Sequence, residues 1–197
     1  ESGGTFNTGL RGFSPCFADM NGDRYPELLV TGDFNTTRYF VNKHNGLFLD
    51  QSEAAGIKVP AYGMGSTIAD LDNDGRLDWY VTAIYKATFG GEGNRLFLNQ
   101  GNDRFSERAA AVGVQDGRWG WGAAAVDLNH DGWLDIVETN GWPLEAQFQN
   151  QPARVWLGQE TGQFSEVASA VGLTHTLDGR GLLTFDYDND GDQDIVI

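Results

Sequence analysis

Short apolar runs alternate with polar turns along the chain, and four of these turns share one acidic pattern. Each acidic turn lies between two apolar runs. The runs that follow the turns cover residues 28–30, 79–81, 136–137 and 195–197. Short apolar runs bounded by Gly, Asn and Asp predict β-strands. The pattern therefore predicts four copies of a strand, an acidic loop and a second strand.

Two further strands are predicted after the acidic hairpin in the first three copies. The third run begins with an arginine, and a phenylalanine ten residues later begins the fourth run. The arginines are Arg38, Arg95 and Arg154, and the phenylalanines are Phe48, Phe105 and Phe164. Four consecutive strands with turns between them predict an antiparallel meander. Because the arginines recur in every complete copy, we expect them to brace neighbouring strands or acidic loops.

The copies begin at residues 19, 70, 127 and 186, and a repeat of this length is typical of β-propeller blades. We predict an all-β propeller segment over residues 1–197, with units at 12–62, 63–119, 120–178 and 179–197. The last unit stops after its second strand. Four blades are the lower limit for a propeller, and even four are incomplete here. We therefore expect a further chain or a missing segment to complete the propeller.

Glycines recur at two fixed distances before the acidic loops. The first set precedes loop position 1 by seven residues and the second set by five. They are Gly12, Gly63, Gly120 and Gly179, followed by Gly65, Gly122 and Gly181, with Ser14 in the first copy. A glycine inside a strand often marks close approach of another backbone. The spacing predicts crowding of the first strands near a central axis.

Oxygen-bearing side chains recur at positions 1, 3, 5 and 9 of each acidic loop. The four sets are Asp19, Asn21, Asp23 and Glu27; Asp70, Asp72, Asp74 and Asp78; Asp127, Asn129, Asp131 and Asp135; and Asp186, Asp188, Asp190 and Asp194. Ca²⁺ binds six to eight oxygens, several of them from carboxylates. The backbone carbonyl of position 7 would add a ligand from Tyr25, Arg76, Trp133 or Asp192. The spacing predicts up to four calcium sites.

Acidic loops of this kind have two alternative interpretations. Asp, Asn and Gly also form ordinary hairpin turns without any metal. An EF-hand needs a Glu at position 12 and flanking helices, whereas position 12 holds Val30, Val81, Glu138 and Ile197. Four copies in one ligand register, each flanked by apolar runs, favour calcium loops over both alternatives.

The formal net charge of −15 makes a nucleic-acid-binding surface a poor expectation. Loop positions 1, 3, 5 and 9 supply half of the 28 acidic residues. Four bound Ca²⁺ ions would reduce the net charge to about −7, an ordinary value for a soluble protein. Cys16 is the one cysteine, so no internal disulfide forms, and we expect it to be a small buried hydrophobe.

The repeated units resemble those of a known family. The form Gly-x-Gly-x4-Asp-x-Asp-x-Asp-Gly-x-x-Asp, followed by an apolar strand, resembles the FG-GAP or VCBS repeats of integrin α-subunit propellers. Residues 96–99 (Leu-Phe-Leu-Asn) and 105–107 (Phe-Ser-Glu) are most similar to the cartilage acidic protein and ASPIC/UnbV group. The resemblance implies a seven-bladed calcium-binding propeller used mainly for recognition. The first loop departs from the pattern at Arg24 and Glu27, and we expect Gly22 to supply the flexibility.

No catalytic arrangement is predicted. His44 lies in a turn, His130 lies at the solvated position 4 of the third loop, and His175 lies in a connector. We expect Trp79, Trp133 and Trp156 to pack between blades. Three other tryptophans, Trp119, Trp121 and Trp142, are candidates for a surface role, since aromatic side chains can anchor a partner.

Our first functional hypothesis is a non-enzymatic propeller that presents loops to a protein or glycan partner. Weak calcium loops fill reliably only where calcium is near millimolar, so we expect an extracellular, cell-surface or periplasmic location. No stretch approaches the roughly 18 apolar residues of a membrane span. The alternative is a polysaccharide lyase or hydrolase built on the same propeller, and a third possibility is a scaffold subunit of a larger assembly.

Overall fold

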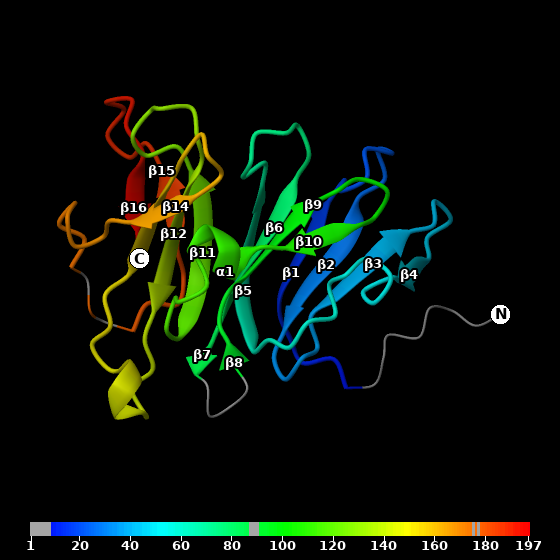
Figure 1. Ribbon diagram of the computed structural model, residues 1–197, viewed down its shortest axis with the longest axis horizontal. Helices are drawn as coiled ribbons and strands as arrows, with labels where there is room; N and C mark the ends of the chain where they lie inside the picture. The colour runs from blue at the N-terminus through cyan, green and yellow to red at the C-terminus, as the bar shows by residue number, and fades with distance from the viewer. Residues whose placement is uncertain (1–8, 87–90, 175, 177) are drawn as a thin grey trace.

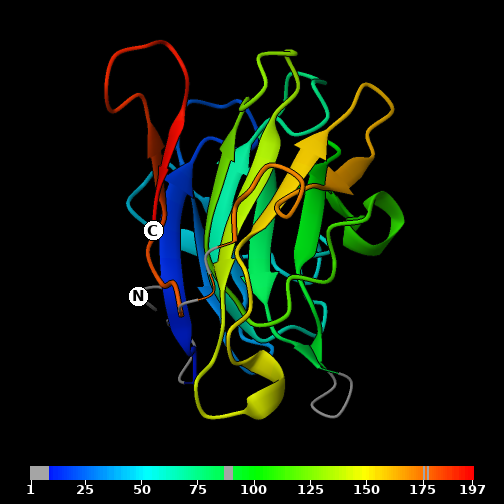
Figure 2. The ribbon, with the colours of Figure 1, turned by 90° about the vertical axis from the view of Figure 1, so that its left-hand side faces the viewer.

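The computed structural model describes residues 9–86, 91–174, 176 and 178–197. Within these residues the chain forms three four-stranded antiparallel sheets and, near its C-terminus, a two-stranded hairpin (Figure 1). The sheets stand side by side with their strands roughly upright, and a view from the side shows the same arrangement (Figure 2). The predicted all-β architecture of four-stranded, blade-like sheets is confirmed.

Each complete sheet is a meander whose strands are neighbours in sequence order. The first sheet contains β1 (Gly12–Ala18), β2 (Glu27–Gly32), β3 (Arg38–Asn42) and β4 (Phe48–Asp50). The second contains β5 (Gly63–Ala69), β6 (Asp78–Ala83), β9 (Arg95–Asn99) and β10 (Phe105–Glu107). The third contains β11 (Gly120–Val126), β12 (Asp135–Asn140), β13 (Arg154–Gly158) and β14 (Phe164–Glu166). The final hairpin pairs β15 (Leu183–Phe185) with β16 (Asp194–Val196).

The remaining elements are short and lie in connections. A small hairpin joins β7 (Tyr85–Lys86) to β8 (Gly91–Glu92), and a 3-10 turn, η2, covers Ala146–Phe148. Both lie at the end of the molecule away from the acidic loops (Figure 1). The one α-helix of the described residues, α1 (Ala109–Val112), is a single turn, and no helix there is long and apolar enough to cross a membrane.

The first junction, between the first and second sheets, is an apolar core. Alternate residues of a strand point to opposite faces, so each sheet offers one set of side chains to each neighbour. The first sheet contributes Leu29, Tyr39 and Val41, and the second contributes Trp79, Val81, Phe97 and Phe105. Trp79 is fully buried here, as predicted for a tryptophan between blades.

The second junction, between the second and third sheets, repeats this arrangement. The second sheet now contributes Tyr80 and Leu96, and the third contributes Ile136, Trp156 and Phe164. Burial of Trp156 confirms its predicted place, whereas Trp133 is only half-buried in the third acidic loop. Its predicted packing between blades is wrong, because position 7 of the loop precedes the strand that enters the junction.

A separate buried cluster lies on the face of the first sheet that points away from the second sheet. Leu28, Val30 and Phe40 form a small cluster with Phe48, and they occupy the repeat positions of Trp79, Val81, Phe97 and Phe105. Phe17, at the edge of this face, is 60% exposed.

Close contact between first strands explains two of the recurrent glycines, Gly65 and Gly122. A Cβ atom on Gly65 would collide with the carbonyl oxygen of Trp121 in the next sheet, and one on Gly122 would lie 2.9 Å from the carbonyl oxygen of Arg180. A threonine reinforces this contact: Thr82 Oγ1 accepts the N–H of Gly65 (2.8 Å) and donates to Trp121 O (2.6 Å). The predicted crowding of the first strands is therefore present.

The aligned arginines brace the third and fourth strands of each sheet. Their partners are acidic residues two positions after the aligned phenylalanine. The pairs are Arg38 with Asp50 (3.6 Å), Arg95 with Glu107 (3.9 Å) and Arg154 with Glu166 (3.8 Å). This confirms the strand-bracing role predicted for the arginines. Cys16, in contrast, is half-buried rather than fully buried, because β1 is the edge strand of its sheet.

Candidate metal centres

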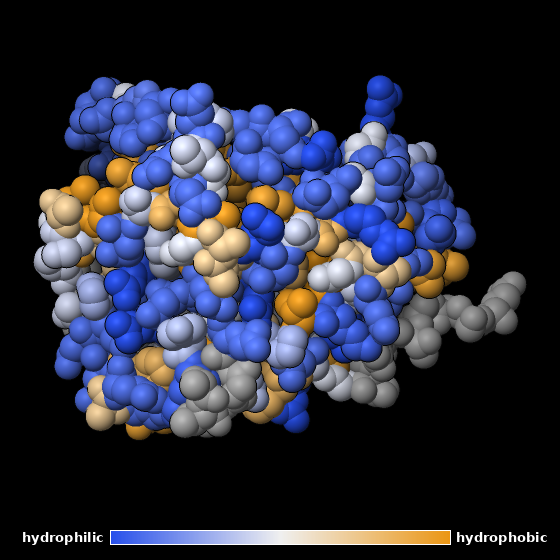
Figure 3. All heavy atoms as spheres, viewed as in Figure 1, coloured by the Kyte–Doolittle hydropathy of each residue, from blue (hydrophilic) through white to orange (hydrophobic). Residues whose placement is uncertain are grey.

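All four acidic loops join the first strand of a sheet to the second. They span residues 19–26, 70–77, 127–134 and 186–193, between the strands given above. Both ribbon views place them at the same end of the molecule (Figures 1 and 2), and that end is hydrophilic on the face drawn in Figure 3. Position 9 of each loop is the first residue of the second strand.

The carboxylate at position 1 organises each loop through backbone hydrogen bonds. In the second loop, Asp70 Oδ1 accepts the N–H of Asp74 (3.0 Å) and Oδ2 accepts the N–H of Gly75 (2.8 Å). In the other loops the same two N–H groups donate to Asp19, Asp127 and Asp186, at 2.9–3.2 Å. Four loops of different sequence therefore adopt one backbone conformation.

The carboxylate at position 5 continues this pattern. Asp74 Oδ1 accepts the N–H of Arg76 at position 7 (2.9 Å). The equivalent bonds run to Asp23, Asp131 and Asp190 at 2.8–2.9 Å from Tyr25, Trp133 and Asp192. Position 7 is thus held by its N–H close to position 5, which suits the predicted use of its carbonyl as a ligand.

Position 9 links three strands. Asp78 is fully buried and accepts the N–H of Leu71 at loop position 2 (2.8 Å) and the N–H of Asn99 at the end of β9 (2.8 Å). Glu27 and Asp135 make the same pair of bonds, and Asp194 makes the first of them. Spacing within the loop does not predict the bond to the third strand. The one feature of the sequence that could indicate it is the acidic residue that recurs at the start of each second strand.

Burial changes the acidity of these position 9 carboxyls. Desolvation raises the pKa of Asp78 to about 7, against the hydrogen bonds from Asn99 and Leu71. Desolvation also raises the pKa of Glu27 and of Asp135. A nearby cation would counter this desolvation by favouring the charged form.

Carboxylates converge in two of the loops. One oxygen each from Asp70, Asp72 and Asp78 lies within 4.8 Å of the other two, and Asp186, Asp188 and Asp194 form the same group in the fourth loop. Ligands at 2.3–2.6 Å from one Ca²⁺ can be separated by up to about twice that distance. Asp72 Oδ1 is buried and has no hydrogen-bond partner among the described residues. The donor set therefore fits a hard, oxygen-preferring cation.

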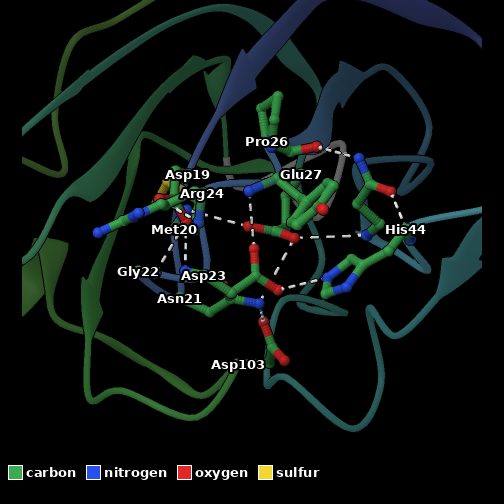
Figure 4. A network of polar contacts seen from close by, with 12 residues as sticks. Asp19, Met20, Asn21, Gly22, Asp23, Arg24, Pro26, Glu27, His44 and Asp103 are labelled. Atoms are coloured by element: carbon green, nitrogen blue, oxygen red, sulfur yellow. Dashed lines mark hydrogen bonds and ion pairs between the residues drawn. The ribbon is translucent and has the colours of Figure 1, made fainter.

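The first loop keeps the shared conformation despite its unusual sequence (Figure 4). Position 6 has positive φ in every loop, and Arg24 adopts it with φ 71°, where Gly75 has φ 88°. Position 4 has positive φ as well, and Gly22 lies there as Asn73 does in the second loop. The expectation that Gly22 compensates for Arg24 is therefore wrong, because the two residues serve different positions.

Neighbouring turns supply extra partners to the first loop. His44 Nε2 lies 2.8 Å from Asp23 Oδ2, and the ring of Tyr25 stacks on His44 at 3.9 Å between ring centres. From the second sheet, Asp103 accepts hydrogen bonds from Asn21 Nδ2 (3.3 Å) and from the Tyr39 hydroxyl (2.6 Å). Figure 4 shows His44 and Asp103 beside the loop. The amide of Asn21 thus partners Asp103, and the imidazole of His44 partners Asp23.

The other singled-out residues lie elsewhere. His130, at position 4 of the third loop, is exposed and contacts Asp192 of the next loop at 3.1 Å, and His175 lies outside the described residues. Trp119 stacks on Trp142 with ring centres 4.8 Å apart, and Trp142 stacks on Trp121 at 6.0 Å. The candidate surface tryptophans form one stack at the end opposite the loops, with Trp119 buried.

Comparisons with known proteins agree with the repeat pattern. The model of the FG-GAP-like repeat matches residues 19–81, 84–138 and 146–197. Cartilage acidic protein 1 of Mus musculus is 36% identical over 150 residues, covering 74% of this chain and 21% of that protein. Integrin alpha-4 of Xenopus laevis is 26% identical over 156 residues, covering 70% of this chain and 15% of that protein.

A fungal protein of known structure shows a looser likeness. This structure, of an Agrocybe aegerita lectin, has a TM-score of 0.47 at 20% sequence identity. The alignment covers 92% of this chain and 45% of the lectin chain. The chain spans about a fifth of the length of the mouse relative. The family model covers most of the chain, with all four acidic loops inside its matches. The chain belongs to the FG-GAP-like repeat family.

Proposed function

We propose that this chain is a calcium-stabilised propeller segment that serves recognition or scaffolding rather than catalysis. The observation that carries the proposal is the common loop conformation together with the convergence, in two of the loops, of carboxylates at positions 1, 3 and 9, as Asp70, Asp72 and Asp78 converge within 4.8 Å. In this proposal Ca²⁺ occupies up to four loops and fixes each hairpin by neutralising its carboxylates. Binding free energy then contributes to folding.

The names of the relatives favour a recognition module over the alternative of a polysaccharide lyase or hydrolase. Cartilage acidic protein 1 and integrin alpha-4, to which this chain is similar, are not named as enzymes. We propose that a protein or glycan ligand binds the assembled propeller and that further blades complete the ring. An extracellular, cell-surface or periplasmic location follows from the same proposal, since such loops need calcium near millimolar.

Calorimetry in calcium and in EDTA tests the metal sites. At a calcium concentration tenfold above Kd, each filled site stabilises the fold by about 1.4 kcal/mol. Three filled sites would raise Tm by roughly 10 °C for a domain of this size. Magnesium at equal concentration is the control, because Mg²⁺ prefers a smaller octahedral site. Identical melting in calcium, magnesium and EDTA, together with no calcium bound in a titration, would refute the proposal.

A further inference from the structure

A pocket lies where the first strands of the units approach one another. Its volume is about 280 Å³, and every unit contributes to its lining. The residue just after the first recurrent glycine lies there in each unit: Phe13, Met64, Trp121 and Arg180. The pocket is therefore built by the repeat itself, while the side chains that give it chemical character differ from unit to unit.

One wall of the pocket is aromatic and held in place. The indole N–H of Trp121 donates to the carbonyl oxygen of Gly141 (2.9 Å), and the ring stacks on Trp142. The ring of Phe13 meets Trp121 edge to face at 6.4 Å, and Phe13 itself is 52% exposed. This wall is rigid on the Trp121 side and open to solvent on the Phe13 side.

Among the described residues that line the pocket, Arg180 is the charged one. Its guanidinium lies 4.2 Å from the ring centre of Trp121 and 5.8 Å from that of Trp142. One of its nitrogens donates to the carbonyl oxygens of Gly179 (3.1 Å) and Gly141 (3.4 Å). Among the described residues, none of the ion pairs includes Arg180, although the chain has 28 acidic residues.

These features favour a ligand with one carboxylate and an apolar face. A guanidinium matches a carboxylate through two parallel hydrogen bonds, and stacking on aromatic rings pre-organises it. Aromatic linings with few polar groups are typical of small-ligand sites, but drug-sized ligands occupy about 300–1,000 Å³. A pocket of 280 Å³ suits a single ring. The net charge of −15 would repel a longer polyanion.

We propose that this pocket binds one carboxylate-bearing sugar residue at the end of a glycan, an inference that rests on the proposed recognition function. Arg180 pairs with the sugar carboxylate, and Phe13 and Trp121 contact the apolar face of the ring. Met64 closes the pocket between them. The sugar is recognised by charge and shape at the propeller axis, away from the candidate metal loops.

The test uses the chain with calcium present and a disaccharide ending in glucuronic acid. Calorimetric titration should show saturable binding with a change in tryptophan fluorescence, and a matched disaccharide ending in glucose should bind about tenfold more weakly or not at all. Arg180→Gln should weaken binding of the acidic sugar by about tenfold or more, and Arg180→Lys by less, since lysine keeps the charge but not the fork. Arg108→Gln, which removes the same charge from another surface, should change nothing.

Phe13→Ala keeps the proposal testable if Arg180 variants fold poorly. Because Phe13 is half-exposed on an edge strand, its loss should leave melting nearly unchanged while weakening sugar binding several-fold. Equal binding of the neutral disaccharide, or undiminished binding by Arg180→Gln, would overturn the inference. Tighter binding of an acidic peptide than of the acidic sugar would also overturn it. Failure here with intact calcium-linked melting would leave the calcium proposal standing.

Discussion

The first and second junctions differ in where their polar contacts lie relative to the acidic loops. At the first junction, Asp103 reaches from the β9–β10 turn to the Tyr39 hydroxyl and to Asn21 beside the loop. At the second junction, Gly162 and Leu96 occupy the equivalent positions. A pocket of about 210 Å³, lined by Leu96 and Gly162, remains next to Asp72. The loop end is therefore linked through the side chain of Asp103 at the first junction, whereas at the second junction Asn73 Nδ2 donates directly to the carbonyl oxygen of Gly132 in the third loop (3.0 Å).

Farther from the loops the two junctions differ again. Glu138 on β12 is fully buried in the second junction, where its Oε2 accepts hydrogen bonds from the Tyr80 hydroxyl (2.7 Å) and from Asn94 Nδ2 (2.7 Å). The equivalent residue in the second sheet, Val81, packs in the apolar core of the first junction. The repeat thus fixes which positions face a neighbour, whereas the polar pairs within a junction are specific to it.

The comparison indicates which loop depends more on a cation. Asn21 is neutral and is tied to Asp103, so the first loop already has partners at position 3. Asp72 is a carboxylate with a buried oxygen that lacks a hydrogen-bond partner among the described residues. Like charges that converge without a partner gain most from a divalent ion. We therefore expect the second loop to bind Ca²⁺ more tightly than the first.

The largest expected effect is a loss of stability with rising pH that depends on Glu138, the buried glutamate of the second junction. Burial raises the pKa of Glu138 to about 8 from an ordinary value of 4.5, with Asp116 adding to the rise and Tyr80, Asn94 and Arg154 opposing it. A carboxyl with a raised folded-state pKa stabilises the fold fully below its unfolded pKa and loses that contribution as pH rises toward the folded pKa. From about pH 5 to about pH 8.5, the chain should lose about 4 kcal/mol relative to Glu138→Gln.

Urea unfolding at several pH values, at constant saturating calcium, measures this difference. The Gln variant keeps the acceptor for Tyr80 and Asn94 but cannot ionise, so subtracting its pH profile isolates Glu138. Parallel profiles for the two proteins would contradict the prediction. They would mean that Glu138 is solvated in solution and that the two junctions do not differ in this respect.

The next effect separates the loop framework from metal binding. In EDTA, Asp78→Ala should lower the free energy of unfolding by about 3 kcal/mol, because two buried N–H groups lose their acceptor. Glu27→Ala should cost less, about 2 kcal/mol, because its bond from Asn42 is longer, at 3.3 Å. Asp74→Ala is the control: it should change stability little in EDTA but lower both calcium affinity and Tm in calcium. An equal loss for Asp74→Ala in EDTA would contradict the distinct role of position 9.

Exchanging the position 3 residues tests the charge difference directly. Asp72→Asn should weaken calcium binding at the second loop by about tenfold, or about 1.4 kcal/mol, because a carboxylate ligand becomes an amide. Asn21→Asp should strengthen binding at the first loop, yet destabilise the calcium-free fold because the new carboxylate faces Asp103. Calorimetric titration of both variants and of the double variant measures the exchange. Unchanged affinities would show that position 3 does not contact the ion.

The sequence predicted the fold well because the repeat shows itself four times. The meander, the loop positions and the strand-bracing arginines all follow from residues that recur at fixed spacing, such as Arg95 and Phe105. The bond from position 9 to the third strand joins residues 21 apart in sequence, so local spacing could not reveal it. Residues that occur once were also hidden, since nothing in the pattern marks Asp103, Glu138 or Arg180 as partners of other units.

The smallest effect concerns position 6, where the first loop has Arg24 and the second has Gly75. A non-glycine residue in the left-handed region destabilises the folded chain by roughly 1–2 kcal/mol. Glycine avoids this cost, but it loses more conformational entropy on folding, which costs about 0.5–1 kcal/mol. Arg24→Gly should therefore stabilise the calcium-free chain by about 0.5–1 kcal/mol relative to Arg24→Ala, which removes the charge but keeps the Cβ. Urea unfolding in EDTA measures both variants. If the two are equally stable, the φ of 71° at Arg24 carries no strain, and the loops differ through their partners alone.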